Sequence, residues 1–448
     1  MTKYIRTLLP GLFCLMLLGT VARAQNQADT KYVNEIRPER LVTPHEAFAK
    51  PYAPGKPKVL FLTMLNRGAS REVAELHQRF GMEFGAVTTF GWRGTTLGTT
   101  SMFAPKKNTG PLDKKKELLA ELEKDYDLVV IGKGLNLNKA LSAKAKYMLF
   151  DKVRNGMGLM VVADSRGSLT HKRRGILPEQ AVRKPLDLDA EQVLAGVPFP
   201  LIKSYKQDRG RGRPEKMFDA FQFGKGRIVG LYVNGPGKEG YRNRHSLTPL
   251  FYYNHREHTY YKYYLSVAAK ALVVAAGIEP SITPAADNPR MVTVEQAALP
   301  AKIDAGTVTV PEGMKGALKI RLRSLLHPTR ELPEHRFGPG EHALSFRVPQ
   351  LPQGDYFIDY RFATDAGVDY WGSVGVAVRN APAHIAKLRL SKTYYNPDEA
   401  AAARVTVSKL LPDLALELSV FDIDGREVVR QRMPIKQLQD QAAVPLHN

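Results

Sequence analysis

Short apolar runs alternate with helical patterns over residues 57–278, and this alternation limits the possible folds more than any other feature of the sequence. Three of the runs are KVLFLTM (58–64), DLVVIGKG (127–134) and GLMVVADSRG (158–167). Runs this short and this apolar are typical of strands that are buried on both faces. An amphipathic pattern follows Ser142, a residue type that often caps a helix. The pattern predicts an α/β domain with a mostly parallel sheet.

The second half of this α/β stretch is less regular. A loop-rich insert is predicted over about 168–216, and FDAFQFGKGRIVGLYV (218–233) then predicts a hairpin that turns at Gly224-Lys225-Gly226. A long apolar helix is predicted from Thr259 to Gly277.

Beyond residue 280 the helical pattern nearly disappears. Alternating stretches separated by turn residues predict an antiparallel β-sandwich over 291–380 and start a second one over 384–448. The second stretch is short for a sandwich, and QDQAAVPLHN (439–448) does not have the pattern of a closing strand. We therefore expect the chain to be a truncated piece of a longer multidomain protein. The predicted fold class is α/β plus all-β.

The N-terminus predicts export. Residues 1–24 contain basic residues, an apolar run of about 14 residues and the sequence Ala-Arg-Ala, the layout of a cleavable signal peptide. The run is shorter than the roughly 20 residues of a membrane-spanning helix. We expect a secreted or periplasmic protein of a bacterial envelope, with no transmembrane segment after cleavage and an irregular leader over 25–56. The one cysteine, Cys14, would be removed, which excludes disulfides, thiolate metal sites and cysteine nucleophiles.

Net charge indicates the kind of partner. Without the first 24 residues the chain has 62 basic and 44 acidic residues, a net charge of +18, and residues 150–262 alone contain 21 basic and 11 acidic side chains. Such a charge favours anionic partners. Candidates are acidic or sulfated glycans, phospholipid head groups and nucleic acid. An exported protein is least suited to bind nucleic acid, and an anionic polysaccharide is the expected partner. Oligomeric state is not predicted.

Three segments together resemble the class I glutamine amidotransferase-like fold, a flavodoxin-like architecture. They are KVLFLTM (58–64), YDLVVIGKG (126–134) and KVRNGMGLMVVADSRG (152–167). The resemblance covers about half of the chain and is closest to the secreted bacterial variant, in which immunoglobulin-like β-sandwich modules follow. It implies oxyanion donors at the Gly132-Lys133-Gly134 turn and a nucleophile elbow at the end of the GLMVVADSRG segment (158–167).

The elbow departs from the family at its nucleophile. It reads Asp164-Ser165-Arg166, and without a cysteine the family's glutamine hydrolysis is excluded. Two interpretations of these residues stay open. Ser165 is a replacement nucleophile, or Asp164 and Ser165 form a polar turn that caps the following segment. Separately, Arg166 is a candidate ligand-binding residue, since open α/β sheets bind ligands at this edge.

Histidines cluster late in the α/β stretch, where the family has its acid/base residue. His245 and His255 are therefore candidates for a catalytic role. The spacing of His255, Glu257 and His258 matches no zinc signature, and the alternative is a solvated helix start. No metal and no cofactor are predicted.

Basic and aromatic residues suggest a glycan site. Arg209, Arg211 and Arg213 alternate with small residues in an insert expected to overhang the ligand edge of the sheet, although such a loop is also compatible with plain solvation. Tyr370-Trp371 in the sandwich is either a sugar platform or a buried aromatic pair.

Three functions fit the sequence. The first is an exported, non-catalytic amidotransferase-like module that binds or helps to process an anionic glycan. The second is a hydrolase of a carbohydrate or acyl substrate that uses Ser165 or Asp164 and a late histidine. The third is a structural envelope scaffold.

Overall fold

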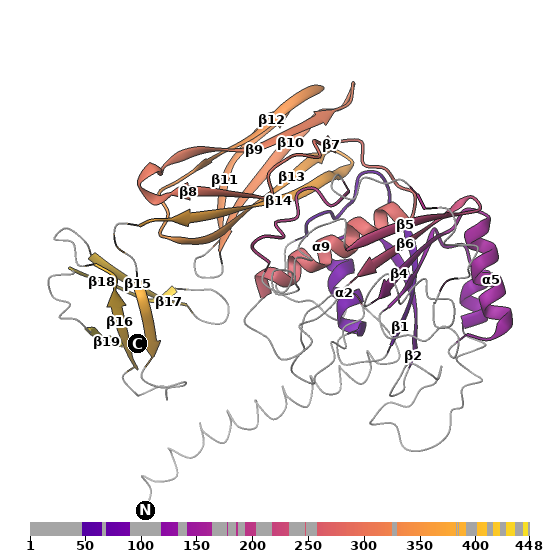
Figure 1. The fold of residues 1–448 in the computed structure, drawn as a ribbon, viewed down its shortest axis with the longest axis horizontal. Coiled ribbons are helices and arrows are strands. Elements are labelled where there is room, and N and C mark those ends of the chain that lie inside the picture. Colours follow the sequence, from indigo (N-terminus) through magenta and orange to yellow (C-terminus); the bar gives the residue numbers. More distant parts are fainter. Residues whose placement is uncertain are drawn as a thin grey trace, which may run out of the picture.

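A computed structural model describes most of the chain between residues 47 and 446. The described residues are 47–64, 69–89, 118–132, 141–163, 177, 185–186, 193–202, 217–232, 247, 258–324, 329–381, 383, 385–390, 401–409, 415–421, 427–434 and 442–446. They form a mixed, strand-rich fold in which a helix-covered sheet is followed by β-sheets (Figure 1).

The first sheet has six strands in the order β2-β1-β3-β4-β6-β5. Five of them are parallel, and β5 pairs antiparallel with β6 at one edge. The predicted mostly parallel sheet and the predicted hairpin are therefore both present. The strands are β1 (Lys58–Met64), β2 (Glu83–Thr89), β3 (Leu128–Ile131), β4 (Gly158–Ala163), β5 (Phe218–Phe223) and β6 (Gly226–Tyr232).

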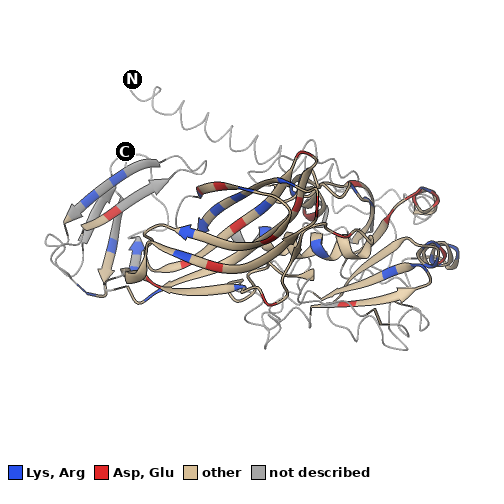
Figure 2. Ribbon diagram, turned by 90° about the horizontal axis from the view of Figure 1, so that it is seen from above, with Lys and Arg blue, Asp and Glu red and all other residues tan. Residues whose placement is uncertain are grey.

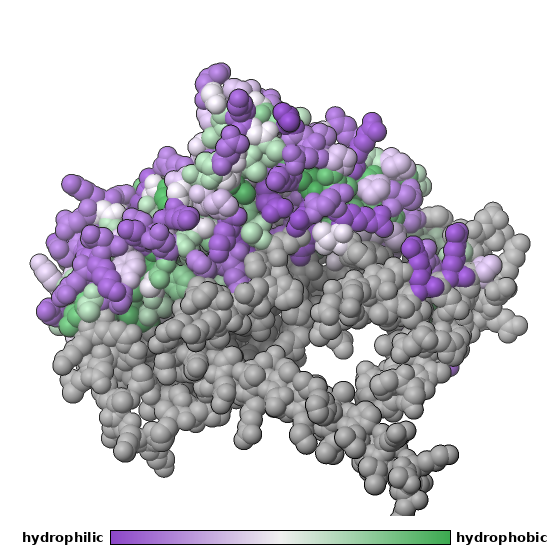
Figure 3. All heavy atoms as spheres, turned by 180° about the vertical axis from the view of Figure 1, so that it is seen from behind, coloured by the Kyte–Doolittle hydropathy of each residue, from purple (hydrophilic) through white to green (hydrophobic). Residues whose placement is uncertain are grey.

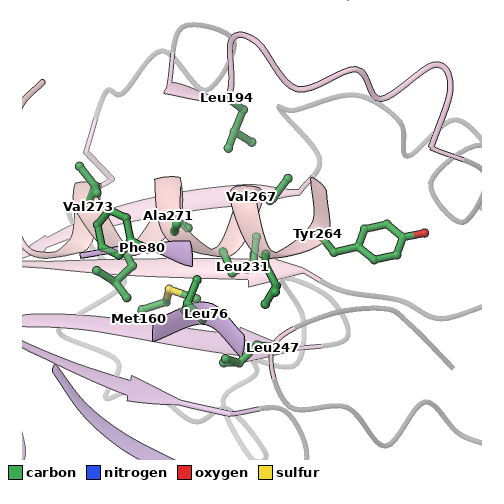
Figure 4. Close-up of a cluster of buried hydrophobic side chains, with 14 of the residues drawn as sticks. Leu76, Phe80, Met160, Leu194, Leu231, Leu247, Tyr264, Val267, Ala271 and Val273 are labelled. Atoms are coloured by element: carbon green, nitrogen blue, oxygen red, sulfur yellow. The ribbon is translucent and has the colours of Figure 1, made fainter. Parts of the chain in front are cut away.

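Helices cover both faces of this sheet. Helices α2 (Ala69–Arg79) and α9 (His258–Ala275) lie on one face, and α5 (Ala143–Arg154) lies on the other beside the helical residues 118–123. The pleat explains the sorting, because successive side chains of a strand point to opposite faces. On β1, Val59 and Phe61 enter the α2/α9 core, whereas Leu60 and Leu62 enter the α5 core. Figure 4 shows part of the α2/α9 core, with Met160 and Leu231 of the sheet on one side of α9 and Leu194 on the other.

The ends of α5 follow from local chemistry. The Ser142 hydroxyl accepts a hydrogen bond from the Ala145 backbone N–H at 3.2 Å, as predicted for the N-cap. At the other end Asn155 is the C-cap, and Gly156 has φ +130°, a backbone conformation that residues other than glycine rarely adopt.

Two further sheets enclose a separate apolar core. One has five strands in the order β11-β10-β13-β14-β8, and the other has three in the order β12-β9-β7. β8 pairs parallel with β14, which the sequence pattern did not suggest. The strands are β7 (Thr283–Pro284), β8 (Met291–Glu295), β9 (Ala301–Val310), β10 (Gly316–Ser324), β11 (Arg330–Phe337), β12 (Gly340–Val348), β13 (Gly354–Thr364) and β14 (Gly367–Arg379).

Strands β13 and β14 differ from their neighbours because both of their faces are covered. Exposed and buried residues alternate along β12, but residues 369–378 of β14 are all buried. Their inner face packs in the two-sheet core, and their outer face packs on α9, where Phe357 stacks on Tyr263 at 4.7 Å between ring centroids. The outer face also contains Trp371, whose indole N–H donates to Ser266 Oγ at 2.7 Å. The outer faces of β13 and β14 thus belong to the α2/α9 core, so the α/β part and the first β-sandwich share this core in addition to the separate core inside the sandwich.

Two segments expected to be loop-like also enter this shared core. Within 25–56, the described residues from 47 onward are irregular, but Phe48 stacks on Trp371 and Tyr52 forms a bridge with Val368. Within the insert, residues 193–202 lie between α9 and β14, where the Ser373 N–H donates to Gly196 O at 2.6 Å.

The last described strands form two small sheets, ordered β15-β16-β19 and β17-β18. The expectation that residues 439–448 form no strand is wrong, because Ala442–Leu446 pairs antiparallel with Ala401–Val405. Val444 supplies β-propensity there, but Pro445 and the small residues around it obscure the pattern. The strands are β15 (Ile385–Leu390), β16 (Ala401–Val407), β17 (Ala415–Phe421), β18 (Glu427–Pro434) and β19 (Ala442–Leu446).

Within the described residues, no helix combines the length and the apolar character that crossing a membrane requires.

Candidate ligand-binding edge of the parallel sheet

The carboxyl ends of the parallel strands lie together at one edge of the first sheet. Leu62 of β1 pairs with Ile131 of β3, and Ala163 of β4 pairs with Tyr232 of β6. Gly132 continues from β3, and its N–H donates to Leu62 O at 2.9 Å. In open α/β sheets, ligands bind at this edge, next to the point where the strand order reverses. Here that point lies between β1 and β3, because α2 follows β1 on one face and α5 follows β3 on the other.

Most of the predicted site residues lie in segments that start from this edge. Lys133 and Gly134 follow Gly132 in the chain, and the elbow residues follow Ala163, the last residue of β4. Of the residues predicted for the catalytic and anion-binding site, Gly132 is the one that the structure describes. The others lie outside the described residues: Lys133, Gly134, Asp164, Ser165, Arg166, Arg209, Arg211, Arg213, His245 and His255.

The arginine-rich segment is connected to the same edge through β5. Since β5 runs antiparallel to β6, its first residue lies where β6 ends, and the Tyr232 N–H donates to Met217 O at 2.9 Å. Residues 203–216 therefore connect Ile202, buried in the core shared with the sandwich, to Met217 at the carboxyl edge.

The histidine-bearing segment is anchored nearby. The Leu247 N–H donates to Glu72 Oε2 at 2.9 Å, and Glu72 lies in the first turn of α2, the helix that follows β1. His245 precedes Leu247 by two residues, and His255 precedes the first residue of α9 by three. Both Glu72 and Leu247 are buried, so this anchor is part of the folded core.

Two polar side chains at this edge were missed by the sequence reasoning. Glu72 is one, and its burial on α2 has no signature in the sequence. Thr63 is the other: it is fully buried near the end of β1, and its hydroxyl has no hydrogen-bond partner within the described chain. A threonine inside the otherwise apolar run KVLFLTM was the available signal.

Aromatic residues considered as sugar platforms are buried where the structure describes them. Tyr370 and Trp371 are each 4% exposed, which excludes a platform at that pair. Tyr147 on α5 is an exposed aromatic, at 71%.

Charge is mixed over the described surface. Figure 2 shows Lys and Arg interspersed with Asp and Glu along the sandwich strands. The view from behind shows a mainly hydrophilic described face with scattered hydrophobic residues (Figure 3). Among the residues that the structure describes, no three His, Asp or Glu side chains come together in a way that would hold a metal ion.

Comparison with known proteins does not assign a family. No family model matches the sequence, and no curated protein matches it. Among solved structures, a tandem-repeat fragment from the extending region of a large adhesion protein aligns at 12% identity, over 31% of this chain and 35% of that one, with a TM-score of 0.16.

Two β-glucosidases align over a larger share of the chain. The Listeria innocua enzyme in complex with isofagomine aligns at 9% identity and a TM-score of 0.18, over 73% of this chain and 47% of that one. The Erythrobacter marinus enzyme aligns at 8% identity and a TM-score of 0.20, over 72% and 47%. The chain thus spans less than half of each of these proteins, and TM-scores this low support no inference about fold or function.

Proposed function

We propose that this chain is an exported protein that binds an anionic polysaccharide at the carboxyl edge of its parallel sheet. The observation that supports this most is the convergence of described anchors at that edge. Four segments that contain the candidate site residues each have one end fixed near that edge, at Gly132, Ala163, Met217 and Leu247. Binding without catalysis is the leading form of the proposal.

The strand order supports an amidotransferase-like ancestry. An order of 2-1-3-4 followed by a further parallel strand is that of doubly wound, flavodoxin-like sheets, and β2-β1-β3-β4-β6 follows it. We propose 57–278 as the amidotransferase-like unit, 291–380 as an immunoglobulin-like sandwich and 384–448 as part of a second one.

The arginines are the proposed source of specificity for anions. Guanidinium groups pair with carboxylates and sulfates in a planar, two-bond geometry. Arg209, Arg211 and Arg213 precede Met217 by four to eight residues, which is close enough along the chain to serve a ligand at the carboxyl edge. Because such contacts are exposed, salt should weaken them.

A binding assay with matched variants tests this proposal. The mature protein is titrated with polygalacturonate, heparin and neutral dextran at increasing salt. We expect binding to at least one anionic polymer, weakened by salt and by joint substitution of the three arginines with serine. The control changes three exposed arginines of the sandwich to serine: Arg330, Arg336 and Arg347. Equal effects of both sets would reject the edge as the site, and no binding to any of these polymers would favour the scaffold function.

Export is tested separately. We expect the mature protein recovered from the producing cell to begin at Gln25, by mass spectrometry of its N-terminus. A mature chain that begins at Met1 would contradict the assignment of a signal peptide.

A hydrolase is the second candidate, and the Leu247 anchor favours it. Its hydrogen bond to Glu72 holds the chain two residues after His245 beside the helix that follows β1, so an imidazole from this segment is a reasonable partner for Ser165 or Asp164. Hydrolysis of a glycan or an ester by the natural protein, lost in D164A and S165A but retained in the three-arginine variant, would establish catalysis.

A further inference from the structure

Lys270 lies in an unusual setting between the α/β part and the first sandwich. It is on α9 and only 5% exposed, and its ammonium nitrogen is 3.0 Å from Trp371 O. The same nitrogen is 4.4 Å from the ring centroid of Tyr370 and 4.8 Å from that of Trp371. Within the described chain this amine has one oxygen acceptor, two aromatic faces and no carboxylate.

Lys262, two turns earlier on the same helix, provides the contrast. Its ammonium group is 3.1 Å from Asp359 Oδ2, and Arg323 Nη1 is 3.3 Å from the same oxygen. Asp359 Oδ1 accepts hydrogen bonds from Tyr263 and Ser373. The junction therefore already holds two cations on one carboxylate before Lys270 is counted.

The remaining titratable groups around Lys270 are engaged elsewhere or do not offset its charge. Asp369 accepts from the N–H groups of Ser281 and Ile282, and the Tyr370 hydroxyl donates to Ala195 O. The charged and titratable groups on the elements that pack about α9 and β14 include Tyr52, Glu72, Glu75, Arg79, Lys262, Tyr263, Arg290, Arg323, Asp359, Tyr360, Arg361, Asp369 and Tyr370.

We propose that Lys270 makes the junction between the α/β part and the first sandwich sensitive to pH near neutrality, and that protonation of its amine loosens the contact between α9 and β14. Burial lowers the pKa of Lys270 from 10.5 to about 7. Acid then places a third cation in an apolar junction, and the Trp371 carbonyl and the two rings only partly compensate for its lost hydration. This inference is independent of any ligand.

The sign of the effect follows from linkage. Between pH 7 and 10.5 the unfolded chain holds a proton on Lys270 that the folded chain lacks, so the free energy of unfolding rises with pH across this window. Below pH 7 the amine is charged in both states and the penalty is complete. From pH 6 to pH 9, this one group should lower the unfolding equilibrium constant roughly 90-fold.

The two tryptophans of the chain allow a direct test at the junction. In W92F, Trp371 is the sole tryptophan, and its carbonyl and ring contact the Lys270 amine. We expect its fluorescence to titrate with a midpoint near pH 7. The transition should disappear in W92F/K270M, which removes the charge, and in W92F/K270R, which keeps it at every pH. An unchanged midpoint in either double variant, or a flat titration in W92F, would overturn the proposal.

Unfolding in urea at pH 6 and pH 9 gives the second readout. The roughly 90-fold change should be present in the natural protein and in K144M, which removes an exposed lysine of α5. Other titrating groups change the unfolding equilibrium constant by a common factor in all three proteins. Once that factor is divided out, K270M should show no remaining change between pH 6 and pH 9. Equal pH dependence in K270M and the natural protein would exclude Lys270 as the responsible group.

Discussion

Asp359 offers the sharpest test of how the α/β part and the first sandwich are joined. Its carboxylate is buried in the junction, where it accepts hydrogen bonds from Tyr263, Ser373 and Lys262 and pairs with Arg323. Burial by itself would raise the pKa of Asp359, but Lys262, Arg323 and the two hydroxyl donors together lower it below its ordinary value. The ionised form is therefore the one that stabilises the fold at neutral pH.

The perturbation is D359N, which keeps the shape of the side chain and removes its charge. At an effective dielectric constant of about 20, unit charges 3.1 Å apart attract by about 5 kcal/mol, before the cost of dehydrating them. Removing one partner of a buried pair leaves the other charge uncompensated and typically costs 3–5 kcal/mol, so we expect a loss of about 3–5 kcal/mol.

Asp355 on the same strand is the matched control. It pairs with Arg379 at 2.6 Å, but both side chains are more than a third exposed, so D355N should cost about 1 kcal/mol or less. Urea denaturation at pH 7, followed by far-UV circular dichroism and by tryptophan fluorescence, measures both variants. If D359N destabilises the protein no more than D355N, the junction is not held by this carboxylate. Since the pKa of Asp359 is lowered, its contribution should be lost in acid, below the ordinary aspartate pKa.

Three further substitutions test local features by the same denaturation assay. S142A removes the N-cap of α5 and should cost about 1 kcal/mol. S281A is the control and should cost little, because Ser281 bonds to Asp369 through its backbone N–H and not through its side chain. Equal costs would contradict the capping role. T63V replaces a buried hydroxyl without a described partner and should stabilise the free protein by about 1 kcal/mol, so a clear loss of stability would mean that the hydroxyl is satisfied. Gly196 and Gly313 both have positive φ, so an alanine at either position should cost about 1–2 kcal/mol from backbone strain alone, which is all that G313A should cost. A Cβ at residue 196 would also lie 2.8 Å from Gly372 Cα, whereas a Cβ at residue 313 meets nothing within 4 Å, so G196A should cost at least twice as much as G313A.

Periodicity in the sequence was sufficient to predict the first sheet. KVLFLTM, DLVVIGKG and GLMVVADSRG are apolar on both faces, and each contains a strand of the parallel sheet. Ser142 and Gly156 mark the ends of α5 through capping chemistry that acts within one turn. These features depend on residues close together in the chain, which is why the sequence reveals them.

Contacts between distant segments were not predictable in the same way. The parallel pairing of β8 with β14 joins residues about 84 apart, and no short-range pattern encodes it. The run DYWGSVGVAV on β14, with one charged residue in ten, was a readable signal for a strand covered on both faces, but the sequence does not show which element covers it. Ion pairing of Lys262 with Asp359 across 97 residues likewise depends on the tertiary fold.

For the candidate site, the sequence predicted which segments reach the ligand edge better than it predicted the polar residues there. The strand order brings Gly132 and Ala163 to that edge, and the segments in which the turn and the elbow were expected continue from these two residues outside the described chain. Glu72 and Thr63 escaped notice because a buried carboxylate and a buried hydroxyl are recognised only once burial is known.

Burial of β13 and β14 on both faces also has a consequence for inheritance. Sandwich modules in multidomain proteins are often exchanged between genes as self-contained cassettes, but a cut near residue 280 would expose Tyr263 on one fragment and Phe357 and Trp371 on the other. The cut would also place Lys262 on one fragment and Asp359 on the other, so neither fragment would contain the complete ion pair. We therefore expect recombination to have preserved residues 47–381 as one heritable block, with fusion points outside it.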